Sequence, residues 1–182
     1  VAVLFLLLSF VLYNRFRLKR KTAVELELRN NEIQHQKHLV DEKQKEIIDS
    51  INYAKRLQQA ILARPEEIKK YLPESFLLYK PKDIVAGDFY FFEVTDSHIF
   101  IAAADCTGHG VPGAFMSMLG VSFLNEIVAD GGETNPGRIL DKLRAKIIKA
   151  LEQKSSDDER KDGMDIALCV WNKSTNILQF AG

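Results

Sequence analysis

The sequence predicts an α+β domain that follows a long charged helix and an apolar N-terminal segment. Residues 22–64 contain neither Pro nor Gly and are rich in Glu, Lys, Gln and Leu, which favours one continuous helix. Beyond Pro65, short strand patterns alternate with apolar helical patterns, as expected of a mixed fold. A chain of 182 residues, 46% of them apolar, is long enough for one such domain and an appendage.

The overall charge and the cysteines exclude several classes of function. The 25 basic residues offset the 25 acidic ones, and no nucleic-acid-binding motif occurs, so no nucleic-acid partner is expected. Cys106 and Cys169 lie far apart, without a Cys or His partner at metal-ligand spacing. They fit a reducing compartment better than a disulfide-stabilised protein.

Residues 1–14 are predicted to be part of a transmembrane helix, and residues 15–21 a basic juxtamembrane segment. The first 13 residues are uncharged and almost wholly apolar, which is shorter than the ~20 residues that span a bilayer. We therefore expect a fragment, cut at both ends, whose span begins upstream. The basic cluster indicates the cytoplasmic side of the inner membrane, with the following domain in the cytoplasm. A signal peptide and a buried helix are the alternatives, although the charges of a signal peptide should precede the apolar run.

The helix predicted over residues 22–64 carries half of a coiled-coil pattern. Leucine, isoleucine, valine or alanine recurs every seven residues, at Leu26, Ile33, Val40, Ile47, Ala54 and Ile61. The second position of the seam is mostly polar, at Asn30, Lys37, Gln44, Ile51 and Gln58. Two interpretations stay open: a solvated spacer, and a weakly paired signalling helix that forms a homodimer.

Residues 65–182 are predicted to form the mixed domain. Asn135 is a candidate N-cap, and Pro112 and Pro136 stand near the starts of two helices. Strands are expected over residues 83–94, 98–105, 164–171 and 177–180, helices over 111–129 and 135–153, and a polar loop over 154–163.

The first two strands predict a pair of opposed carboxylates. If Asp96 and Ser97 are the central residues of a two-residue turn, Val94 faces Ile99 and Asp88 faces Asp105. Like charges at facing positions are destabilising, so a cation is expected between them. Carboxylates without His or thiolate partners suit hard ions such as Mg²⁺ or Mn²⁺. The alternative is an aspartate that caps its own loop.

The loop after Asp105 supports the metal interpretation. Gly108 and Gly110 allow a tight turn that presents backbone groups to an ion, and a helix N-terminus follows. His109 between them is more simply explained as a loop residue than as a metal ligand.

The stretches "VAGDFYFF" and "AAADCTGHGVPGAFMS" resemble the PPM (PP2C-like) metal-dependent protein phosphatases of the SpoIIE and RsbU type. The resemblance covers roughly residues 50–182 and implies an αββα sandwich with two Mn²⁺ or Mg²⁺ ions. By this resemblance, Asp105 bridges both ions, the backbone carbonyl of Cys106 is a ligand, and Asp88 binds through the metal-water shell. Asp88 and Asp105 are then catalytic, and His109 is a candidate proton donor.

Two departures from that family pattern concern the acidic residues. Many relatives have a second acid three residues after the first, where this chain has Phe91. The family's later acidic motifs are expected beyond Gly182. Asp162 and Asp165 are predicted to be loop or structural residues rather than replacements for them.

The resemblance implies a serine/threonine phosphatase, and the apolar N-terminal segment predicts that it is tethered to the membrane. Its substrate would be phosphoserine or phosphothreonine on a signalling protein such as an anti-sigma-factor antagonist. The alternative is a noncatalytic, membrane-tethered helical adaptor with a degenerate metal site.

Overall fold

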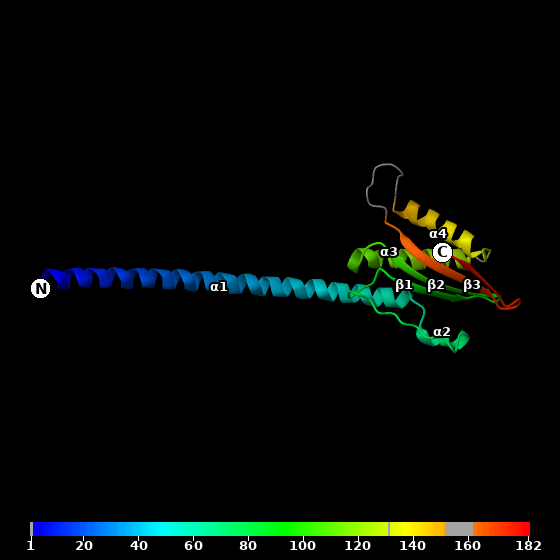
Figure 1. Cartoon of the computed structure of the whole chain (residues 1–182), viewed down its shortest axis with the longest axis horizontal. Coiled ribbons are helices and arrows are strands. Elements are labelled where there is room, and N and C mark those ends of the chain that lie inside the picture. Colours follow the sequence, from blue (N-terminus) through cyan, green and yellow to red (C-terminus); the bar gives the residue numbers. More distant parts are fainter. Residues whose placement is uncertain (1, 131, 152–161) are drawn as a thin grey trace. The chain divides into compact units, whose positions relative to one another are not determined.

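The computed structural model describes residues 2–130, 132–151 and 162–182 (Figure 1). Two units divide the chain, Val1–Asp49 and Ser50–Gly182, and the sheet belongs to the second. The four helices and four strands of the described residues confirm the predicted α+β class. The helices are α1 (Ala2–Ile61), α2 (Pro65–Tyr71), α3 (Gly110–Ala129) and α4 (Pro136–Ala150), and the strands are β1 (Phe89–Val94), β2 (His98–Cys106), β3 (Met164–Asn172) and β4 (Ile177–Ala181).

Helix α1 extends from Ala2 to Ile61 and so includes the apolar and basic segments that precede residue 22. This continuity has a simple cause, because the first proline of the chain is Pro65 and the first glycine is Gly87. The short helix α2 follows, with Pro65 at its start, two glutamates in its first turn and two lysines in its last turn. These charges complement the helix dipole, although the sequence pattern had not predicted the helix.

The four strands form one antiparallel sheet in the order β1-β2-β3-β4. The predicted hairpin register is confirmed, since Val94 faces Ile99 and Tyr90 faces Ala103. The turn closes through a hydrogen bond of 2.9 Å from the Thr95 N–H to the His98 carbonyl. Strand β1 begins only at Phe89, so the strand prediction is wrong for residues 83–88.

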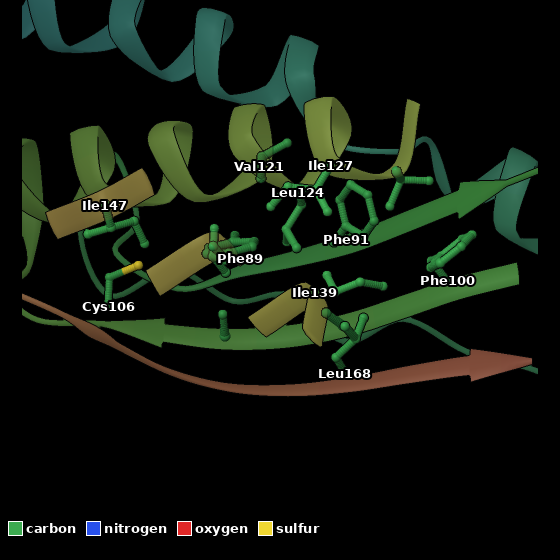
Figure 2. Packing of buried hydrophobic residues seen from close by; sticks show 14 of the residues in the cluster. Phe89, Phe91, Phe100, Cys106, Val121, Leu124, Ile127, Ile139, Ile147 and Leu168 are labelled. Atoms are coloured by element: carbon green, nitrogen blue, oxygen red, sulfur yellow. The ribbon is translucent and has the colours of Figure 1, made fainter. Parts of the chain in front are cut away.

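Helices α3 and α4 cover one face of this sheet and form the hydrophobic core (Figure 2). Alternate strand residues supply one side of the core, because successive side chains of a strand point to opposite faces. Helix α3 is apolar around most of its circumference. Among the described residues it is the one helix long and apolar enough to cross a membrane, and half of it is buried in the domain. The central side chains are Phe89, Phe91, Phe100, Leu124, Ile139, Leu143 and Leu168.

Helix α4 begins as predicted, with the Asn135 side chain accepting a hydrogen bond of 3.1 Å from the Arg138 N–H. Ile139, Leu143 and Ile147 are buried along one side of the helix, which explains their four-residue spacing. The helix ends at Ala150, three residues before the predicted end. Most of the polar loop predicted over 154–163 lies outside the described residues.

The second face of the sheet, here called the open face, carries Ala103, Asp105, Asp165, Leu178 and Phe180. The side chains of Leu178 and Phe180 are 60% and 67% exposed, and in the described part of the chain no helix covers them. Near β1 this face is covered, because Tyr71 at the end of α2 contacts Phe92 and the side chains of Phe92 and Ile99 are buried. The sheet and the layer formed by α3 and α4 are half of the implied αββα sandwich. The aspartates lie at one end of the open face.

Candidate metal centre

Asp88 and Asp105 stand at the same end of the β1–β2 hairpin. Phe89 pairs with Ala104, so the same register continued by one residue sets Asp88 against Asp105. Burial raises the pKa of the Asp88 carboxyl, and the hydrogen bond and negative charge of Asp105 raise it further. The predicted juxtaposition of two carboxylates is therefore confirmed.

A third aspartate lies beside this pair. Asp165 of β3 is the direct cross-strand partner of Asp105, so their side chains point to the same face. Asp88, Asp105 and Asp165 line one groove, here called the acidic groove, together with Tyr79 and Lys80. Asp165 lies in β3, within the strand predicted over residues 164–171, and its assignment as a structural residue rather than a replacement for the later acidic motifs stays a prediction. Asp162 precedes β3, as predicted for a loop residue.

Close backbone contacts fix the two segments that carry Asp88 and Asp105. A methyl group added to Gly87 or to Gly113 would lie 2.6 Å from the Gly108 carbonyl oxygen, so neither position accepts a larger residue without a shift. Gly108 itself has a φ of 90°, a conformation that side chains disfavour. The segment before Asp88, the loop after Asp105 and the first turn of α3 therefore pack backbone against backbone.

Two tyrosines hold the surroundings of Asp88. The Tyr79 hydroxyl donates a hydrogen bond of 3.1 Å to the Asp88 carbonyl, and the Tyr90 hydroxyl donates one of 2.8 Å to the Ala63 carbonyl. Burial, followed by the neighbouring Tyr90 and Asp88, raises the pKa of the Tyr79 phenol, which keeps it protonated as a donor. The two rings also meet edge to face.

The side chain of Cys106 belongs to the core on the helix-covered face (Figure 2). Burial, followed by the charges of Asp105 and Asp88, raises the pKa of its thiol to about 12. A protonated, buried thiol is a poor metal ligand. Only the backbone carbonyl of Cys106 suits the predicted role, and that role stays a prediction.

His109 lies apart from the three aspartates. Its Nδ1 is 3.0 Å from an oxygen of Asp83, and its side chain is 74% exposed. The residues that line the acidic groove do not include it. The structure links His109 to the segment before β1, and its role as proton donor stays a prediction.

Comparisons with known proteins agree with this geometry. The family model described as Stage II sporulation protein E (SpoIIE) matches residues 95–182. Among solved structures, the SiaA-PP2C domain of Pseudomonas aeruginosa is 35% identical with a TM-score of 0.64, over 76% of this chain and 54% of that one. The chain carries a SpoIIE/PP2C-type domain. It spans about half the length of the solved domain, and no curated protein gave a match.

The donors of this SpoIIE/PP2C-type domain fit a hard divalent cation. Two facing carboxylates and neighbouring backbone carbonyls are oxygen donors, which Mg²⁺ and Mn²⁺ prefer. In the part of the chain that the structure describes, no lysine or arginine forms an ion pair with Asp88 or Asp105. No three Asp, Glu, His or Cys side chains of the described residues gather closely enough to hold one ion. Water and backbone carbonyls would therefore complete the coordination, as is common for Mg²⁺.

Proposed function

We propose that the protein is a metal-dependent phosphatase that hydrolyses phosphoserine or phosphothreonine on a signalling protein. The observation that carries the proposal is the juxtaposition of Asp88 and Asp105 in a groove of a SpoIIE/PP2C-type domain. By the same family resemblance, the substrate would be a protein of the anti-sigma-factor antagonist type.

The chain's own residues would have distinct tasks in this reaction. Asp88 and Asp105 would hold Mn²⁺ or Mg²⁺, with the carbonyl of Cys106 as a further donor. Bound ions would supply Lewis-acid polarisation of a phosphoryl oxygen and stabilise its negative charge. Lys80 lines the same groove. Its ammonium group would attract the phosphate dianion and orient it toward Asp88 and Asp105.

The decisive experiment measures phosphate release from a phosphoserine peptide by the whole protein, with and without Mn²⁺, beside its Asp105→Asn variant. Turnover that requires Mn²⁺ and is lost in the variant is the expected result. Circular dichroism of both proteins controls for folding. A folded, metal-loaded protein without turnover would instead favour the noncatalytic adaptor.

We also propose that residues 1–14 lie in the inner membrane and keep the phosphatase domain in the cytoplasm. In support, this part of α1 is helical and apolar, with Val3, Leu4 and Phe5 each more than 70% exposed, and it is followed by a basic cluster. Flotation of the whole protein with lipid vesicles tests the tether. A protein that stays at the bottom of the gradient would refute it.

A homodimer through α1 is a separate proposal. Leu26, Ile33, Val40 and Ile47 recur every seventh residue, and their side chains are 59–61% exposed. Sedimentation equilibrium of a detergent-solubilised protein should give twice the chain mass. The charge introduced by Val40→Glu should convert the dimer to a monomer. A Val40→Glu protein that stays dimeric would show that the dimer contact lies outside this part of α1.

A further inference from the structure

Gln58 of α1 is a buried polar side chain, only 4% exposed, and its hydrogen bonds reach the domain. Its amide nitrogen donates to the Ala86 carbonyl at 2.6 Å, and its amide oxygen accepts from the Ala86 N–H at 3.1 Å. The side chain therefore satisfies both backbone groups of one residue, as a neighbouring strand would. The contact therefore occupies the hydrogen-bonding groups of Ala86, which lies outside β1.

The same amide also reaches helix α3. Its nitrogen lies 2.7 Å from the Ser117 hydroxyl oxygen. That hydroxyl lies 2.9 Å from the Ala114 carbonyl and 3.2 Å from the Ala86 carbonyl, to one of which it donates. Ser117 is 1% exposed, so the whole network is excluded from water. A buried and fully satisfied polar network fixes relative positions more strictly than apolar contacts do.

The network joins the three segments that determine where the two aspartates lie. Ala86 stands two residues before Asp88, and Gly87 between them packs against the loop that follows Asp105. Ser117 belongs to α3, which begins five residues after Asp105. A displacement of the Gln58 amide would thus move the Asp88 backbone relative to Asp105.

We propose that Gln58 is a positioning residue of the metal centre, which holds Asp88 at the distance from Asp105 that binding of the ion requires. The inference rests on the proposed function and extends it from the carboxylates to a residue of α1. Metal affinity then depends on the position of the last turns of α1.

The test substitutes Gln58 by Met, which keeps the length and packing of the side chain and removes its hydrogen bonds. Gln59 is the next residue of the same helix and is exposed, so Gln59→Met is the matched control. Free Mn²⁺ is followed by electron paramagnetic resonance during titration of the whole protein, at a temperature where circular dichroism shows every variant folded. This readout does not depend on turnover, and a merely stabilising residue would leave it unchanged.

We expect Gln58→Met to weaken Mn²⁺ binding about tenfold or more, the usual loss when a residue that supports metal ligands is removed. Gln59→Met should match the wild type. Equal affinities for Gln58→Met and the wild type would overturn the inference and leave the proposed function intact. A wild-type protein that binds no Mn²⁺ would overturn both.

A second variant covers the case in which Gln58→Met does not fold. Ser117→Ala removes only the link to α3 and keeps both hydrogen bonds between Gln58 and Ala86. A smaller but measurable loss of Mn²⁺ affinity supports the inference, and an affinity equal to that of the wild type contradicts it.

Discussion

Asp105 of β2 faces Asp165 of β3, so two carboxylates stand side by side on the open face of the sheet. Facing like charges destabilise a sheet, and a cation bound nearby relieves the repulsion. Neutralising Asp165 should therefore have two effects. The metal-free domain should become more stable, and the stability that it gains from bound metal should become smaller.

We expect Asp165→Asn to raise the free energy of unfolding of the metal-free protein by about 0.5 kcal/mol. The same variant should gain less thermal stability from added Mn²⁺ than the wild type does. Calorimetry with a chelator and then with Mn²⁺ measures both effects. Asp41→Asn, on the exposed surface of α1, removes the same charge as a control. Identical melting curves for Asp165→Asn and the wild type would show that the two carboxylates do not interact.

Gly113 should tolerate no side chain. A methyl group there would lie 2.6 Å from the Gly108 carbonyl oxygen and 2.9 Å from the Gly87 Cα, and all of these atoms are backbone. Gly113→Ala should therefore cost about 1–3 kcal/mol of stability and also weaken Mn²⁺ binding, because it forces apart the segments that carry both aspartates. Gly132→Ala, where a methyl group meets nothing within 4 Å, is the control. Chemical denaturation and Mn²⁺ titration test the prediction, which a stable, normally binding Gly113→Ala would refute.

Cys106 should make stability depend on pH in the alkaline range. Its thiol has a pKa of about 12 in the folded chain, compared with an ordinary value of 9.0 that applies on unfolding. Burial of the neutral thiol therefore contributes fully below about pH 9, and the contribution is lost as the pH rises toward 12. Denaturant midpoints at pH 8 and 10 should fall more in the wild type than in Cys106→Ala. Parallel losses in the two proteins would contradict the assignment.

The parts of the fold that depend on local sequence could be predicted. The two-residue turn at Asp96 and Ser97 fixes the hairpin register, and this register alone brings Asp88 to Asp105. The N-cap at Asn135 is likewise a contact between near neighbours in sequence. Each feature needs only residues a short distance apart, which is why pattern and spacing were enough.

Contacts between distant segments could not be predicted in the same way. Asp165 reaches Asp105 only because β3 pairs with β2, and no local signal sets the register of strands so far apart. Gln58 stands at a seam position of the seven-residue pattern, but its side chain is buried against Ala86 and Ser117, so the seam interpretation is wrong for this residue. Periodicity identifies the side of a helix that makes contacts, but it does not identify the partner.

The contact between His109 and Asp83 allows two roles of the histidine to be distinguished by mutation: a tether for its loop and a proton donor. An exposed side-chain contact of this kind contributes little to stability, so loss of either partner should leave the melting temperature nearly unchanged. If the pair only tethers the loop, His109→Gln and Asp83→Asn should reduce kcat by similar factors of less than about tenfold, whereas removal of a general acid typically costs 10²–10⁴-fold. We expect the first outcome, because His109 is bound to Asp83 and does not line the acidic groove. Steady-state kinetics of both variants with a phosphoserine peptide decide the matter. A loss of 10²-fold or more confined to His109→Gln would establish the histidine as the proton donor.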